Sequence, residues 1–182
     1  LYTFISTGFF RTMENRFEGK IIKEIGLKGA EDITVSYADS FAIISATARL
    51  EFPPIGQEHG GLYLLELKSG DFVVKHLTAD FDLPFAPHGI SMLKTDSTYT
   101  IAVVNHTEDG HTIEFFSLYD EKLTHIRTQK STSLVSPNDI VLLDENRFYV
   151  TNDHGYEEGI GRLVEEYGNL AISNVVYFDG QN

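Results

Sequence analysis

The sequence predicts an all-β fold built from repeated four-stranded units. Short runs of β-branched and aromatic residues alternate with turn sequences, which is typical of antiparallel sheets. A short polar motif also recurs three times before an isoleucine, at intervals that suit one four-stranded unit each. The sequence predicts no long amphipathic helix and no alternation of strands with helices, so a parallel α/β fold is disfavoured.

The expected strands are rich in Val, Ile, Thr, Phe and Tyr, which favour extended backbone. In chain order they lie at residues 33–37, 41–45, 62–67, 72–77, 90–94, 100–105, 112–118, 123–128, 140–143, 147–151 and 174–178. Turn sequences at 68–71 and 108–110 predict hairpins between their neighbouring strands. Residues 1–23 form a separate N-terminal segment, with weak helical character expected over residues 9–23.

The repeated motif reads EDI at 31–33, HGI at 88–90 and NDI at 138–140, so its isoleucines lie 57 and 50 residues apart. Each copy opens a hairpin, and four-stranded units at this spacing are typical of β-propeller blades. We place the blades near residues 31–80, 88–130 and 138–182, within a domain that covers residues 24–182. A closed propeller has about four to eight blades. We therefore expect a second half of the propeller, supplied by a missing segment or by another chain.

Length and composition restrict the class of protein. The 182 residues are 42% hydrophobic, which is sufficient for a packed core. The formal net charge of −13 disfavours nucleic acid as a partner and suits a cation such as Ca²⁺. The absence of cysteine excludes disulfides, thiolate zinc sites and cysteine nucleophiles. Residues 1–10 are apolar and short, so a membrane-anchoring role of this segment is a weaker alternative. The sequence leaves the compartment open, although a secreted, periplasmic or membrane-associated protein is favoured over a nuclear one.

Four side chains of the repeated motif are candidate metal ligands: Glu31, Asp32, Asn138 and Asp139. Their carboxylate and amide oxygens are the hard donors that Ca²⁺ prefers. Adjacent residues point in different directions, so the two pairs could serve two ions. The competing interpretation, which the residues alone favour, is that they form Asx turns that start strands.

Two histidines are candidate acid–base groups. His88 and His106 lie at the two ends of one inner hairpin, and an imidazole can act as a general base at neutral pH. Zinc binding and a purely structural role remain open for both. His154 has the corresponding position in the third unit and could line the same channel. The remaining histidines are expected to be structural: His59, His76, His111 and His125.

Five motifs together resemble the paraoxonase/arylesterase family. They are GAEDI at 29–33, FAPHGIS at 85–91, VVNH at 103–106, PNDIV at 137–141 and FYVTNDH at 148–154, in the order and approximate spacing of that family. The sequence contains no G-x-S-x-G elbow, no H-E-x-x-H motif and no glycine-rich phosphate loop, so other hydrolase and nucleotide-binding classes lack their usual motifs.

The resemblance implies a six-bladed β-propeller that holds two calcium ions and hydrolyses lactones and aryl esters, with this chain forming about the first three blades. It implies Glu31 and Asn138 as ligands of a catalytic calcium, and Asp32, Asp139 and the backbone carbonyl of Ile90 as ligands of a structural calcium. It further implies His88 as the general base, His106 as its partner, and Phe52, Asp153 and His154 as tunnel-lining residues. Two alternatives stay open: a non-catalytic calcium-stabilised propeller that binds a partner, and an unrelated β-sandwich.

Overall fold

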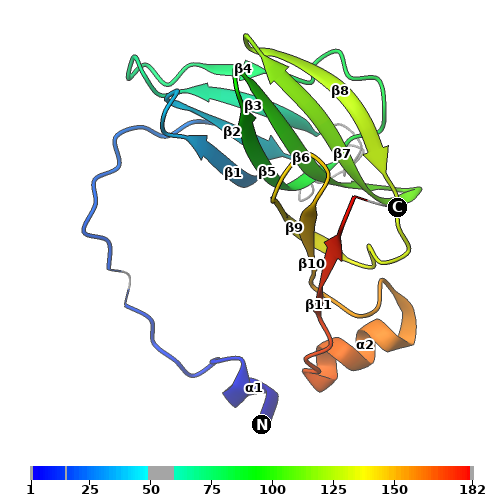
Figure 1. The fold of residues 1–182 in the computed structure, drawn as a ribbon. Coiled ribbons are helices and arrows are strands. Elements are labelled where there is room, and N and C mark those ends of the chain that lie inside the picture. The colour runs from blue at the N-terminus through cyan, green and yellow to red at the C-terminus, as the bar shows by residue number, and fades with distance from the viewer. Residues whose placement is uncertain (1, 15, 49–59, 181–182) are drawn as a thin grey trace.

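The computed structural model describes residues 2–14, 16–48 and 60–180, and the fold is nearly all β (Figure 1). The described residues form three antiparallel sheets and two helices. The predicted all-β class is confirmed.

The first sheet contains β1 (Ala30–Ser36), β2 (Phe41–Ala46), β3 (Gly61–Glu66) and β4 (Val74–His76), paired in chain order. The central strand β2 is buried almost throughout, because both of its faces are covered. Ala42 and Ile44 pack on one face with Ile25 and Leu27 of the preceding segment. Ile43 points to the other face and joins the core shared with the second sheet.

The second sheet contains β5 (Pro87–Thr95), β6 (Thr98–Thr107), β7 (Gly110–Tyr119) and β8 (Lys122–Gln129), again paired in chain order. Two-residue turns connect these strands. Asp120 and Glu121 both have a positive φ, as the turn that suits the twist of a hairpin requires. The predicted hairpin at 108–110 is confirmed, since β6 ends at Thr107 and β7 begins at Gly110.

The third sheet contains β9 (Pro137–Leu142), β10 (Phe148–Asn152) and β11 (Asn174–Phe178), with β10 in the centre. Helix α2 (Gly159–Gly168) lies between β10 and β11, where the sequence analysis expected no helix. Its sequence GIGRLVEEYG contains three glycines, which lower helix propensity and obscure the periodic pattern. A tertiary contact helps to hold the helix: the buried carboxylate of Glu165 accepts hydrogen bonds from the Gly155 amide.

The three sheets stack face to face in chain order. On β6, Ile101 and Val103 point into the core shared with the first sheet, while Ala102 and Val104 point into the core shared with the third. The alternation of side chains along a strand explains why one strand serves both cores. This stacking places β1 beside β5 and β5 beside β9.

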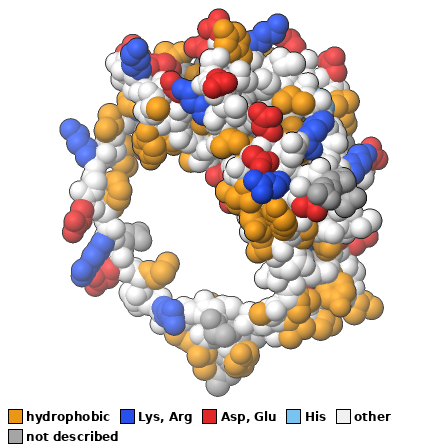
Figure 2. Space-filling view, viewed as in Figure 1, with side chains coloured by type: hydrophobic (Ala, Val, Ile, Leu, Met, Phe, Trp, Pro, Cys, Tyr) orange, Lys and Arg blue, Asp and Glu red, His pale blue; other side chains and the backbone are white. Residues whose placement is uncertain are grey.

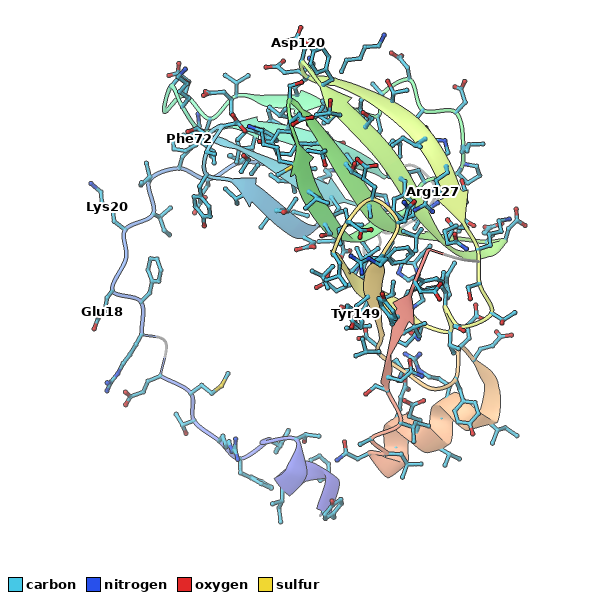
Figure 3. All side chains as sticks on the ribbon, viewed as in Figure 1. Glu18, Lys20, Phe72, Asp120, Arg127 and Tyr149 are labelled. Atoms are coloured by element: carbon cyan, nitrogen blue, oxygen red, sulfur yellow. The ribbon has the colours of Figure 1, made fainter. Side chains whose placement is uncertain are left out.

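The N-terminal segment extends away from the sheets. Helix α1 (Tyr2–Ser6) is its only helix among the described residues, and no helix is present over residues 9–14 and 16–23, where weak helical character is expected from the sequence. Side chains such as Glu18 and Lys20 are exposed (Figure 3), so a helix in this segment would lack the tertiary packing that stabilises most helices. Apolar side chains are exposed over α1 and α2 (Figure 2). Neither helix is long and apolar enough to cross a membrane, within the residues described.

Candidate active site

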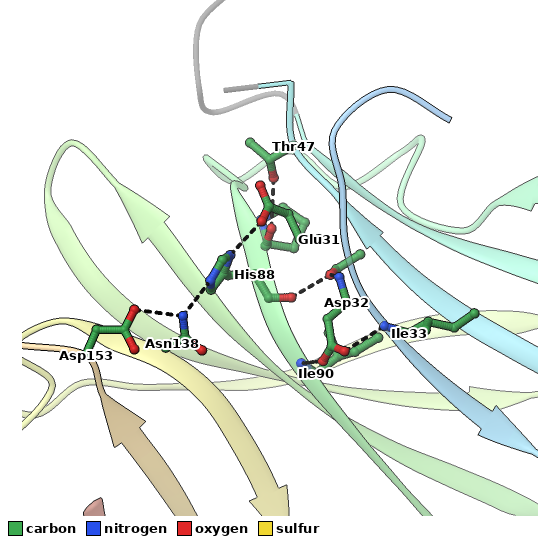
Figure 4. Close-up of polar contacts among 10 residues, drawn as sticks. Glu31, Asp32, Ile33, Thr47, His88, Ile90, Asn138 and Asp153 are labelled. Carbon is green, nitrogen blue, oxygen red and sulfur yellow. Dashed lines mark hydrogen bonds and ion pairs between the residues drawn. The ribbon is translucent and has the colours of Figure 1, made fainter. Parts of the chain in front are cut away.

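The predicted polar residues lie where β1, β5 and β9 meet, each strand belonging to a different sheet (Figure 4). Glu31 and Asp32 lie in β1, His88 in β5, and Asn138 and Asp139 in β9. Residues that are about a hundred positions apart in the sequence therefore lie together.

A register irregularity accompanies the motif in each sheet. The pairing shifts between Ala30 and Asp32 on β1, between Pro87 and Ile90 on β5, and opposite β9 between Val150 and Asn152. Such bulges redirect side chains and are frequent beside functional sites. The irregularities lie at the polar residue two positions before each isoleucine: Glu31, His88 and Asn138.

His88 is the centre of the cluster. Its Nδ1 lies 3.1 Å from Oε2 of Glu31, and its Nε2 lies 3.1 Å from Nδ2 of Asn138. The same Asn138 nitrogen donates to Oδ2 of Asp153 at 2.8 Å. The side chains of His88 and Glu31 are 21% and 23% exposed, so the pair is largely shielded from water.

The hydrogen-bond chemistry fixes the protons of His88. A carboxylate only accepts, so Asp153 requires that the amide nitrogen of Asn138 faces it. That nitrogen then donates to Nε2 of His88, which carries no hydrogen in the neutral ring. The hydrogen is left on Nδ1, which is buried and faces Glu31 at ion-pair distance without aligned hydrogen-bond geometry. Nε2 is therefore the basic nitrogen of this histidine.

Two hydroxyl groups of the first sheet hold the backbone of β5 at the site. Ser45 donates to the carbonyl of His88, and Thr47 donates to the carbonyl of Pro87 at 2.9 Å. Neither residue belongs to the repeated motif, so neither was predicted as part of the site. The signal that could have identified them is the polar end of the apolar strand FAIISAT, at the same end as the motif.

Asp32 and Asp139 have equivalent roles in their strands. Each Oδ1 accepts the amide hydrogen of the following isoleucine at 2.7 Å, and Oδ2 of Asp32 also accepts from the Ile90 amide at 2.8 Å. The local interactions agree with the strand-initiating alternative, but each carboxylate still has lone pairs for a further partner. The contact with Ile90 brings together two of the predicted ligand residues.

The two aspartates are electrostatically coupled across Gly89. A Cβ on Gly89 would lie 2.4 Å from the Asn138 carbonyl oxygen and 2.5 Å from the Asp139 Cα, so β5 and β9 approach more closely than any side chain would allow. Burial raises the pKa of Asp139, and the negative charge of Asp32 raises it further. The arrangement thus places two carboxylates where a cation would relieve their repulsion.

The described residues contain no group of three or more His, Asp or Glu side chains that could hold a metal ion. The two predicted ligand sets do not depend on such a group of three, because one combines a carboxylate with an amide oxygen and the other combines two carboxylates with a backbone carbonyl oxygen. Carboxylate, amide and carbonyl oxygens match the preference of Ca²⁺, which takes about six to eight ligands. The residues present fit part of such a shell.

His106 extends the cluster away from Glu31. Its ring contacts His88 edge to face, with centroids 5.4 Å apart and planes at 74°. Its Nδ1 lies 2.9 Å from Nδ1 of His111, which the sequence analysis had assigned a purely structural role. The predicted hairpin contained the missing signal, because residues 106 and 111 pair directly across it.

Of the predicted tunnel-lining residues, His154 and Asp153 have different surroundings. His154 has its Nδ1 3.3 Å from Oε1 of Glu165 on α2, whereas Asp153 belongs to the His88 cluster. Phe52 lies outside the residues that the structure describes.

The fold and the cluster define an all-β protein with a candidate acid–base site at the junction of three antiparallel sheets. The chain belongs to the arylesterase family, whose family model, described as Arylesterase, matches residues 11–182. The resemblance found in the five motifs is therefore confirmed.

Two serum paraoxonases illustrate the similarity. The chain is 36% identical over 160 residues to serum paraoxonase/arylesterase 2 of Rattus norvegicus, covering 82% of this chain and 44% of that relative. It is 34% identical over 161 residues to serum paraoxonase/arylesterase 1 of Homo sapiens, with the same coverage of 82% and 44%. The chain thus spans about half the length of the curated relatives it matches.

Proposed function

We propose that the protein containing this chain is a calcium-dependent hydrolase of lactones and aryl esters. The observation that carries the proposal is the position of His88, held between Glu31 and Asn138 from two other sheets. Membership of the arylesterase family and similarity to proteins named paraoxonase/arylesterase support the same chemistry. The partner is a small ester or lactone.

We further infer a six-bladed β-propeller in which the three sheets are about the first three blades. Face-to-face stacking in chain order, with one strand of each sheet at a common junction, supports this architecture. The remaining blades would come from a segment outside this chain or from another chain.

Two calcium ions would use the oxygen donors described above. Glu31 and Asn138 would hold the catalytic ion, and Asp32, Asp139 and the Ile90 carbonyl would hold the structural ion, with further ligands from the second half. The repulsion between Asp32 and Asp139 supports a cation at the second position. When bound, calcium polarises the ester carbonyl and stabilises the negative charge that develops on its oxygen.

Side chains of this chain would accept and return the proton of the attacking water. In the reaction, water would replace the Asn138 amide as the hydrogen-bond donor to Nε2 of His88. Nε2 then accepts a proton from that water while the water oxygen attacks the carbonyl carbon, and the proton later goes to the leaving oxygen as the ester bond breaks. Glu31, facing Nδ1, stabilises the positively charged ring. Asp153 orients the Asn138 amide so that its oxygen remains for the cation. His106, in contact with the ring of His88, assists as the second histidine.

The test uses the full-length protein with phenyl acetate and a simple lactone as substrates. His88→Gln should lower turnover by roughly 100-fold or more and leave calcium affinity nearly unchanged. Glu31→Ala should weaken calcium binding. His76→Gln is the matched control, because it makes the same substitution on β4, the edge strand of the first sheet that lies farthest from β1. If the protein binds calcium, hydrolyses neither substrate and is unaffected by His88→Gln, the enzymatic proposal fails in favour of a non-catalytic binding module.

A further inference from the structure

Beyond His106, a line of ionisable side chains continues toward the surface. His106 on β6 and His111 on β7 have their Nδ1 atoms 2.9 Å apart, and Nε2 of His111 lies 3.4 Å from Oε1 of Glu157. Exposure increases along this line, since the side chain of His111 is 16% exposed and that of Glu157 is 60% exposed. The line begins at His88, whose ring contacts that of His106.

We propose that Glu157, acting through His111, sets the tautomer of His106 and carries protons from it to solvent. This inference rests on the proposed hydrolase function, in which His106 assists His88. Glu157 and His111 are positioning residues in this scheme, because neither touches the substrate.

The hydrogen-bonding capacities of Glu157 and His111 determine which nitrogen of His106 carries its hydrogen. The Glu157 carboxylate lies 3.4 Å from Nε2 of His111 and only accepts, so its negative charge favours the neutral tautomer of His111 that has a hydrogen on Nε2 and none on Nδ1. The short contact between the two Nδ1 atoms requires one hydrogen between them, which must therefore belong to His106. Neutral His106 is left with a bare Nε2, which is the form that can accept a proton.

The same arrangement permits proton transfer without rotation of a ring. When Nε2 of His106 gains a proton, its Nδ1 hydrogen can move to Nδ1 of His111. The Nε2 hydrogen of His111 can then move to Glu157. Glu157 then releases the proton to solvent, so one proton enters the line and one leaves it. Both rings end neutral with their hydrogens on the opposite nitrogens, and the reverse movement of the hydrogens restores the starting form.

His111 and Glu157, the residues of this line nearest the surface, border a surface cavity. It has a volume of about 610 Å³ and is lined by His111 and Glu157, together with Asp109 and Lys130. Among the described residues, the ionisable groups placed beside His111 by this cavity and by the ring contact are Asp109 in the β6–β7 turn, Lys130 after β8, Glu157 in the loop before α2 and His106 on β6. Water in the cavity would exchange the proton with bulk solvent.

The experiment combines ¹⁵N NMR of the histidine rings with kinetics of the full-length protein. In the unmodified protein, the ¹⁵N shifts of His106 should report a hydrogen on Nδ1 and none on Nε2. In Glu157→Gln, whose amide can donate or accept, His106 should become a mixture of tautomers. Turnover should fall about fivefold at neutral pH with KM unchanged, since an exposed pair contributes modestly. Glu158→Gln is the matched control, because it makes the same substitution at the next, exposed residue.

A second variant tests the relay step. His111→Leu should shift the pH dependence of turnover, and imidazole added to the buffer should restore part of the lost rate by replacing the missing proton carrier. A His106 tautomer that is unchanged in both Glu157→Gln and His111→Leu would overturn the proposal, whatever the activity. If the unmodified protein hydrolyses no ester or lactone, the proposed function fails, and the NMR result still decides whether Glu157 sets the tautomer.

Discussion

Within the cluster, the hydrogen-bonding capacity of each side chain determines the orientation of its neighbour. Asp153 determines which atom of the Asn138 amide faces His88, and that amide determines which nitrogen of His88 is basic. Each step follows from the rule that a carboxylate cannot donate. Preorganisation of this kind removes the need to reorient side chains during a reaction.

Gly89 permits the close approach of β5 and β9 on which the cluster depends. Gly89→Ala should destabilise the protein by about 1–3 kcal/mol, because the new methyl group would overlap the Asn138 carbonyl and force the strands apart. Urea denaturation measures this change. Gly26→Ala is the control, since a Cβ there meets no atom within 4 Å. Equal stability of the two variants would show that the strands separate at no cost.

Among the elements, an ion pair of Asp39 links the first two sheets away from the site. Asp39, in the β1–β2 turn, accepts from Lys94 of β5 at 2.6 Å and also from the hydroxyl of Tyr99 on β6. The hydrogen bond from Lys94, followed by that from Tyr99, holds the pKa of Asp39 below its usual value. The ionised carboxylate therefore favours the folded state.

This shift predicts a pH dependence of stability. A lowered folded-state pKa gives a contribution that is present above the unfolded pKa of about 3.9 and is lost as the pH falls through the folded value. Asp39→Asn should therefore lower the urea midpoint at pH 7 and have a diminishing effect as the pH falls below about 4. Asp80→Asn, at an exposed position, serves as the control. A deficit of Asp39→Asn that persists unchanged at low pH would contradict the assignment.

The sequence allowed the strands to be predicted where local and tertiary preferences agree. The predicted strand at 174–178 coincides with β11, and the turn at 108–110 is where the β6–β7 hairpin turns. Helix α2 could not be predicted in this way, because its glycines oppose helix formation and its main tertiary tie is a single buried carboxylate, that of Glu165. The contact of His111 with His106 follows from the predicted hairpin, whereas its contact with Glu157 could not be predicted, because Glu157 lies in the loop before α2.

The attachment of α2 through Glu165 can be tested directly. Glu165→Ala removes the acceptor of the Gly155 amide and the partner of His154, so the helix should open more readily by about 1–3 kcal/mol. Amide hydrogen exchange of residues 159–168 measures the opening. Glu166→Ala is the control, because this neighbouring carboxylate is paired with Arg162 at the exposed surface of the helix. Unchanged exchange in Glu165→Ala would mean that other contacts hold the helix.

In the molecule as a whole, each of the three sheets contains one copy of the repeated motif, and the stacking of the sheets brings the three copies together at the candidate site. Apolar residues of β6 supply both inter-sheet cores, and the polar motif of each sheet lies at the shared junction. The motif residues could be predicted from the sequence because the same position recurs before each isoleucine. The partners that orient them, such as Ser45 and Thr47, could not, because they contact a different sheet.

The proposed calcium ions couple the junction to the stability of the entire protein. A cation that binds only the folded state stabilises it by about 2.7 kcal/mol at a concentration 100 times its Kd. Removal of calcium from the full-length protein with a chelator should therefore lower Tm, and added calcium should restore it. Asp32→Asn should reduce this calcium-dependent part. Its single amide oxygen can still accept the hydrogen bond from Ile90, whereas the hydrogen bond from Ile33 is lost, so the calcium-independent Tm should fall as well. Asp80→Asn should respond to calcium as the unmodified protein does. A Tm that is independent of calcium in all three proteins would remove the structural ion from the scheme, because the repulsion between Asp32 and Asp139 would then be balanced by the protein alone.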